Sequence, residues 1–168
     1  MPTYNFSVMI SRPEVDEDTA TDRLYEAGCD DALFSVSGGV YELEFDREAP
    51  TLRDAVLSAI RNVKSAGTGA RVLRIVPDDL VNANAIAERS GKTRQAVRLW
   101  TRGERGKDFP PPVTKVGDSP VWSWASVAEW LRGRGDVGPT TVDEAKALIE
   151  INRVLERESI PPPSFPQR

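Results

Sequence analysis

Residues 82–106 read NANAIAERSGKTRQAVRLWTRGERG. The apolar residues Ile86, Ala87, Val97 and Trp100 have the spacing of two short helices that bury their inner faces against each other. Gly91 stands between these helices, at a turn that requires a positive φ angle. The stretch therefore predicts a helix-turn-helix.

The second of these helices is expected to expose a polar surface that suits the edges of DNA bases. Thr93 is placed to cap it, which leaves Arg94, Gln95 and Arg98 on its early, solvent-facing side. Arginine can donate two hydrogen bonds to guanine, and glutamine can pair twice with adenine. Helix pairs with a glycine turn also occur in proteins that never meet DNA, so this feature alone leaves both interpretations open.

The residues that follow predict a two-stranded wing and another helix. Residues 109–112 are Phe-Pro-Pro-Pro, and residues 113–116 and 120–124 read as two strands joined by a turn at 117–119. Ser126 and Glu129 have the spacing of a capping box for a short helix after the wing. The tryptophans of this region are expected to fill a small core, because duplex DNA offers no exposed base faces for stacking; they are Trp122, Trp124 and Trp130.

Taken in order over roughly residues 80–132, this series resembles the MerR and excisionase-like winged helix-turn-helix family, and the whole two-part arrangement resembles a group of bacterial helix-turn-helix proteins. The resemblance implies binding to double-stranded DNA, with base contacts from the second helix and a backbone contact from Lys115 in the wing. The long basic linker over 101–107 departs from the family. Its charges either solvate a loop or contact phosphates, and we favour phosphate contact. The DNA-binding residues expected in all are Thr93, Arg94, Gln95, Arg98, Arg102, Arg105, Lys107 and Lys115.

The distribution of charge agrees with this expectation. The chain of 168 residues has a formal net charge of −4, but residues 81–135 carry 10 basic and 5 acidic side chains, a charge of +5. Residues 1–80 carry −7 and residues 136–168 carry −2. Positive charge is therefore confined to the segment in which DNA binding is expected.

The first 77 residues predict an acidic domain of a different kind. Strands with alternating apolar residues are expected over 4–10, 32–36, 41–45 and 71–76, with helices beginning near Asp16 and after the cap Thr51. The order βαββαβ favours a ferredoxin-like sandwich, with both helices on one face of an antiparallel sheet and the acidic residues Glu42, Glu44 and Asp46 on the open face. The fold class is thus α+β, with a boundary at residues 77–79.

No catalytic, metal or cofactor site is expected, and the protein is not expected to be an enzyme. The chain has no histidine, and Cys29 is its only cysteine. Acidic neighbours are expected to raise the pKa of Cys29 and blunt its reactivity. Residues 67–69, Gly-Thr-Gly, lack the lysine of a phosphate loop, and the acidic residues over 14–18 fit a solvated helix start.

The C-terminal helix is expected either to dock on its own chain or to pair with a second copy of the protein. Thr141 and Glu144 form a second capping box for a helix from about Val142 to Glu158, within a segment 136–160, and residues 161–168 form a proline-rich tail. Because one winged helix reads few base pairs, we expect a homodimer.

The function expected is that of a transcriptional regulator, a sequence-specific DNA-binding protein in the cytoplasm without membrane contact. The alternative is an antitoxin or adaptor whose acidic N-terminal domain, residues 1–77, binds a protein partner or effector.

Overall fold

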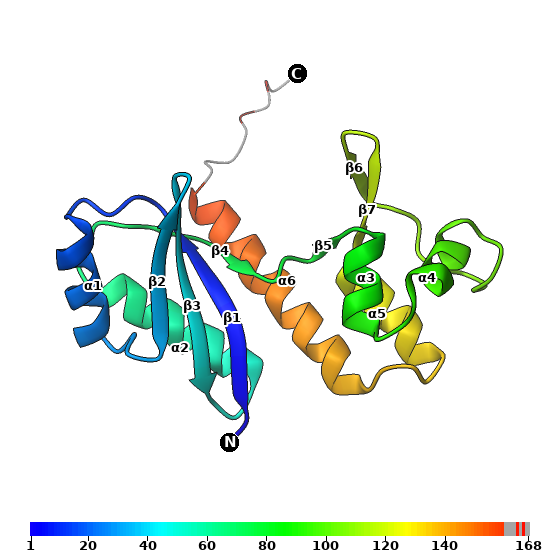
Figure 1. Ribbon diagram of the computed structural model, residues 1–168, viewed down its shortest axis with the longest axis horizontal. Coiled ribbons are helices and arrows are strands. Elements are labelled where there is room, and N and C mark those ends of the chain that lie inside the picture. The colour runs from blue at the N-terminus through cyan, green and yellow to red at the C-terminus, as the bar shows by residue number, and fades with distance from the viewer. Residues whose placement is uncertain (160–163, 165, 167–168) are drawn as a thin grey trace. The chain divides into compact units, whose positions relative to one another are not determined.

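The computed structural model describes residues 1–159, 164 and 166, and it has an α+β fold (Figure 1). Six helices and two antiparallel sheets lie within these residues. The chain divides into two compact units: unit 1 comprises Met1–Pro77 together with the chain from Glu150 onward, and unit 2 comprises Asp78–Ile149. Except for Ser164 and Pro166, the proline-rich tail expected over 161–168 lies outside the described residues.

Unit 1 contains a four-stranded antiparallel sheet in the order β2-β3-β1-β4. Its strands are β1 (Thr3–Ile10), β2 (Ala32–Ser37), β3 (Val40–Glu48) and β4 (Val72–Val76). The alternation predicted for the first strand is confirmed, because Phe6, Val8 and Ile10 are buried. Phe6 lies opposite Phe45 of β3, and their rings stack with centroids 5.4 Å apart.

Two helices, α1 (Glu17–Glu26) and α2 (Leu52–Ser65), pack against one face of this sheet (Figure 1). Asp16 and Thr51 cap them, since each side chain accepts a hydrogen bond from a backbone N–H of the first turn. The cap predicted at Thr51 is therefore confirmed. The acidic residues of β3 alternate with its buried residues, so they lie on the face of the sheet away from the helices.

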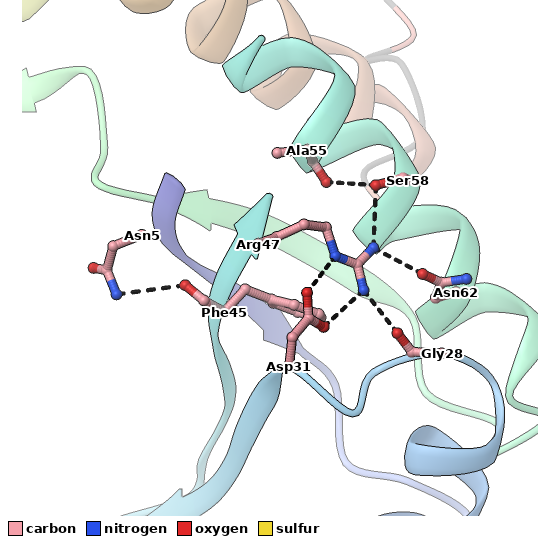
Figure 2. A network of polar contacts seen from close by, with 8 residues as sticks. All are labelled: Asn5, Gly28, Asp31, Phe45, Arg47, Ala55, Ser58 and Asn62. Atoms are coloured by element: carbon pink, nitrogen blue, oxygen red, sulfur yellow. Dashed lines mark hydrogen bonds and ion pairs between the residues drawn. The ribbon is translucent and has the colours of Figure 1, made fainter. Parts of the chain in front are cut away.

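A buried arginine ties the sheet to α2 (Figure 2). The guanidinium of Arg47 donates to both carboxylate oxygens of Asp31, at 2.8 and 2.9 Å, and to the carbonyl oxygen of Gly28 at 2.7 Å. Its remaining hydrogen bonds go to Ser58 and Asn62. Hydrogen bonding to Asp31 raises the pKa of Arg47. Because every N–H of the guanidinium can be paired within unit 1, this cluster has a structural role: it links β3 to α2 and to the segment before β2.

Helix α6 (Pro139–Ser159) begins three residues earlier than predicted. The capping box predicted at Thr141 and Glu144 is wrong, because Thr141 already lies inside the helix. Proline suits the first position of a helix, where its φ angle is preset and no N–H is needed, so Pro139 starts the helix. Pro139–Ile149 belongs to unit 2, and the helix from Glu150 onward belongs to unit 1.

Unit 2 contains β5 (Leu80–Val81), α3 (Ala83–Ser90), α4 (Arg94–Thr101), β6 (Thr114–Val116), β7 (Ser119–Ser123) and α5 (Trp124–Gly133). The three strands form a sheet in the order β5-β7-β6. The four apolar residues predicted to lie between the paired helices are all buried in one core; they are Ile86, Ala87, Val97 and Trp100. Trp122, Trp124 and Leu131 belong to the same core.

The capping box predicted at Ser126 and Glu129 is also wrong, because α5 begins two residues before Ser126. Ser123 is the cap, and its hydroxyl accepts from the backbone N–H of Ser126. Asp79 satisfies the two preceding N–H groups: its carbonyl accepts from Trp124 at 2.7 Å, and its carboxylate from Ala125 at 2.9 Å. This contact lets the helix start directly after β7. Among the described residues, no helix is both long and apolar enough to cross a membrane.

Candidate nucleic-acid interface

The turn between α3 and α4 fixes where the candidate recognition helix begins. Gly91 ends α3 with a φ angle of +68°, as the sequence predicts. The side chain of Thr93 accepts a hydrogen bond from the backbone N–H of Ala96 at 3.1 Å, so the predicted cap of α4 is confirmed. The turn and the cap together set the first residues of α4 at the protein surface.

Helix α4 has one buried face and one exposed polar face. Val97 and Trp100 are buried in the core of unit 2. Arg94, Gln95 and Arg98 are exposed, and within the described part of the chain their side chains make no hydrogen bond or ion pair. Their donor groups are therefore available to an external ligand.

Arg89 of α3 has a structural role instead. Its guanidinium donates to the carbonyl oxygen of Asp78 at 2.9 Å and lies 5.6 Å from the ring centroid of Trp124. Burial lowers the pKa of Arg89, and the nearby carboxylates of Asp79, Asp78 and Glu88 oppose that effect. This arginine contributes to the positive charge of the segment, but its guanidinium is partly buried and is held by contacts within unit 2.

An aromatic cluster holds the long linker after α4. Phe109 packs against three tryptophans, with ring centroids 5.0 Å from Trp130, 6.0 Å from Trp100 and 6.2 Å from Trp122. The indole N–H of Trp130 donates to the carbonyl oxygen of Lys107 at 2.9 Å, and that of Trp122 donates to Pro110 at 3.1 Å. The tryptophans therefore contribute to the core and anchor the linker.

This anchoring leaves the basic side chains of the linker in solvent. Arg102, Arg105 and Lys107 are exposed, and none of their side chains has a hydrogen-bonding or ionic partner among residues 1–159. Lys115 is also exposed, in the outer strand β6, where it pairs through its backbone with Pro120. Figure 1 shows the β6–β7 hairpin projecting from the helices of unit 2. All eight predicted residues thus lie on α4 or its cap, on the linker or on the hairpin.

A groove of about 870 Å³ lies beside α4, and it brings the predicted residues Arg105 and Lys107 together with Lys92 and Arg134, which sequence reasoning missed. Four basic residues line it from three separate segments: Lys92 from the turn, Arg105 and Lys107 from the linker, and Arg134 from the end of α5. Trp100, Trp130 and Gln95 also line it. The +5 charge of residues 81–135 includes Lys92 and Arg134, but nothing in their spacing indicates that they meet.

Asp136 holds two of these cations in place. Its carboxylate lies 3.0 Å from Lys92 Nζ and 3.2 Å from Arg134 Nε. The contact between Arg134 and Asp136 Oδ2 is an ion pair but not a hydrogen bond, since Asp136 Oδ2 accepts no hydrogen bond. The guanidinium of Arg134 lies over both indoles, 5.1 Å from the centroid of Trp100 and 4.7 Å from that of Trp130.

The described residues contain no cluster of three or more carboxylate, thiol or imidazole groups that can hold a metal ion. Burial raises the pKa of Cys29 to about 11, and Asp31 and Asp30 add to the rise while Arg47 opposes it. The direction predicted for Cys29 is confirmed, but burial contributes more than the acidic neighbours do.

Comparison of the chain with protein-family models, with curated proteins and with solved structures finds no match. The proposal for its function therefore depends on the geometry and charge of unit 2.

Proposed function

We propose that the protein binds double-stranded DNA in a sequence-specific manner and acts as a transcriptional regulator in the cytoplasm. On this proposal unit 2 is a winged helix-turn-helix of the MerR and excisionase-like kind, and unit 1 is a ferredoxin-like accessory domain. Helix α4 enters the major groove, while the linker and the β6–β7 hairpin follow the phosphate backbone.

One observation carries the proposal: Arg94, Gln95 and Arg98 share the exposed face of a capped helix, and their side chains have no hydrogen-bonding or ionic partner in the described chain. An arginine can read guanine through its O6 and N7 atoms, and a glutamine can read adenine through N6 and N7. The exposed basic side chains of the linker and hairpin supply the phosphate contacts that such a helix needs to hold its register.

The test is a titration of the purified protein with duplex DNA at several salt concentrations, read by mobility shift. We expect affinity to fall with salt at a log–log slope of about −0.9 for each phosphate contact. A selection from random duplexes then supplies the preferred sequence. Absence of binding at low salt is the result that contradicts the proposal.

Arg98→Ala separates base reading from general charge. If Arg98 makes a bidentate base contact, this variant loses about 1–3 kcal/mol on the preferred duplex and relaxes the preference at one position. Arg61→Ala is the matched control, because Arg61 is an exposed arginine on α2 of unit 1. An unchanged preference with Arg98→Ala rejects the base contact and leaves general DNA binding standing.

We further propose that the protein acts as a homodimer, since two modules on a repeated site gain affinity that one module lacks. Analytical ultracentrifugation with and without the selected duplex tests this. A strict 1:1 complex of monomer and duplex contradicts it.

The acidic face of unit 1 favours a second candidate function, an adaptor or antitoxin that binds a basic protein. Glu44 and Asp46 are exposed neighbours on one face of β3, and Asn5 donates to both of their carboxylates, at 3.4 and 3.0 Å. Copurification with a basic protein, lost in a Glu42→Gln, Glu44→Gln and Asp46→Asn variant, supports this candidate. DNA binding that survives the same three changes assigns the two roles to different units.

A further inference from the structure

We propose that the groove beside α4 receives a phosphate of the DNA backbone, and that Lys92 and Arg134 are phosphate contacts. The inference rests on the proposed function and deepens it, because neither residue belongs to the recognition helix, the linker or the hairpin. It concerns how the helix is fixed against the duplex, and not which bases it reads.

Four cations converge on the groove. Three segments that are distant in sequence bring Lys92, Arg105, Lys107 and Arg134 to one groove. Bringing cations together costs free energy unless an anion offsets their repulsion. Asp136 is the one carboxylate that pairs with any of the four within the described residues. A net positive charge therefore faces the groove, and a phosphate complements it.

The protein also holds Arg134 in position before any ligand binds. Its guanidinium stacks on Trp100 and Trp130 and is tethered by Asp136, so little side-chain freedom is left to lose on binding. About two-fifths of the side chain remains exposed. An arginine that is fixed yet open to solvent can present N–H donors to a phosphate oxygen.

The groove lies next to the first residues of the candidate recognition helix. Gln95, which we expect to face a base edge, also lines it, and so does the cap residue Thr93. Base edges in the major groove are flanked by backbone phosphates, and side chains next to a recognition helix commonly contact them. A duplex that offers a base to Gln95 thus brings a phosphate close to the groove.

The experiment measures the salt dependence of duplex binding for the full chain and for two variants, Lys92→Ala and Arg134→Ala. Each variant is expected to reduce the log–log slope by about 0.9 without changing base preference. Raising the salt from about 50 to about 200 mM weakens duplex binding. For each variant this weakening should be about 3.5-fold smaller than for the unchanged protein, because a slope change of about 0.9 acts over a fourfold change in salt.

Arg132→Ala is the matched control, because Arg132 is an exposed arginine at the same end of α5 that does not line the groove. Arg134→Ala also removes the contact with two indoles, so circular dichroism must first show that this variant keeps the native helix content. Lys92→Ala keeps that stacking and remains informative in either case. The inference is overturned if Lys92→Ala and Arg134→Ala have the same salt slope as the unchanged protein. It is also overturned if their slopes fall no further than the slope of Arg132→Ala. In both cases the proposed function stands.

A second arm distinguishes a backbone phosphate from a small phosphate compound. Pyrophosphate is titrated into the protein while the fluorescence of the tryptophans is followed, with duplex DNA titrated in parallel. Duplex binding that depends on Lys92 and Arg134, with pyrophosphate acting only as a weak competitor, supports the inference. Pyrophosphate binding that depends on these residues, in a protein that binds no duplex, overturns both the backbone assignment and the proposed function.

Discussion

Asn152 of α6 forms two hydrogen bonds with the backbone of Ile75 in β4. The N–H of Ile75 donates to Asn152 Oδ1 at 2.8 Å, and Asn152 Nδ2 donates to the carbonyl oxygen of Ile75 at 3.1 Å. Because β4 is an edge strand, these backbone groups have no neighbouring strand on that side. The buried side-chain amide of Asn152 therefore makes the two hydrogen bonds that the backbone of a neighbouring strand would otherwise make with Ile75.

Replacing Asn152 with leucine should lower the free energy of unfolding of unit 1 by about 2–4 kcal/mol, since it leaves a buried N–H and a buried carbonyl without partners. Urea unfolding followed by far-ultraviolet circular dichroism measures the change. Arg153→Ala, at the exposed neighbouring position, serves as the control and should have little effect. A loss below about 0.5 kcal/mol in the leucine variant means that water satisfies these groups instead.

Arg47→Met should destabilise unit 1 by about 3 kcal/mol, because it leaves the half-buried carboxylate of Asp31 without its ion-pair partner. Adding Asp31→Leu to this variant removes the unpaired charge and should restore part of the loss. The same urea titration provides all the values for a double-mutant cycle. Additive losses from the two changes contradict a direct coupling.

Two glycines of the linker allow a matched comparison. Gly103 and Gly106 both have positive φ angles, +74° and +78°. A Cβ at Gly106 lies 2.8 Å from Trp100 and 3.0 Å from Trp130, whereas one at Gly103 has nothing within 4 Å. Gly103→Ala should cost about 1 kcal/mol through backbone strain alone, and Gly106→Ala should cost more.

Tryptophan fluorescence can report this difference, because all four tryptophans of the chain lie in unit 2. Only Gly106→Ala is expected to change the native emission spectrum, since only that change displaces the indoles that hold the linker. Identical spectra and equal losses of stability for the two variants refute the proposed close packing.

Thr93→Ala should lower the free energy of unfolding of unit 2 by about 1 kcal/mol, because the backbone N–H of Ala96 loses its acceptor. Thr93→Ser retains the hydroxyl and should stay close to the unchanged protein. Urea unfolding followed by tryptophan fluorescence measures both. If serine and alanine cost the same, the lost methyl group accounts for the effect and the cap does not.

Cys29 should react slowly with thiol reagents in the folded protein. A pKa of about 11, against an ordinary 9.0, leaves about 100-fold less thiolate near pH 8. The raised pKa also means that folding favours the neutral thiol. Its contribution to stability is therefore fully present below about pH 9 and is lost as the pH rises through about 11.

Labelling with a disulfide reagent tests the thiol directly, by comparing the native protein with the protein in denaturant. Rapid labelling is expected only in denaturant. Equal rates in both states contradict the burial of Cys29.

The local patterns of the sequence predicted the strands of unit 1 and the helix pair of unit 2. Alternation along β1 and helical spacing around Gly91 depend on residues that are near neighbours in the chain, so they can be read without the fold. The starts of α5 and α6 were both predicted too late. At α5 the signal is not local, because Asp79 supplies acceptors from 45 and 46 residues away, and a distant acceptor leaves no trace in local spacing. At α6 the signal is local, since Pro139 takes the first position of the helix, but the spacing of Thr141 and Glu144 favoured a later start.

By itself the sequence determined which residues α4 buries and which it exposes, because a period of 3.6 residues turns Arg98 away from the face that buries Val97 and Trp100. It also determined that positive charge collects in residues 81–135. Only the tertiary structure decided that Lys92 and Arg134 meet across Asp136 beside that helix. Such a meeting depends on how the core of unit 2 packs, and packing joins residues without regard to their separation along the chain.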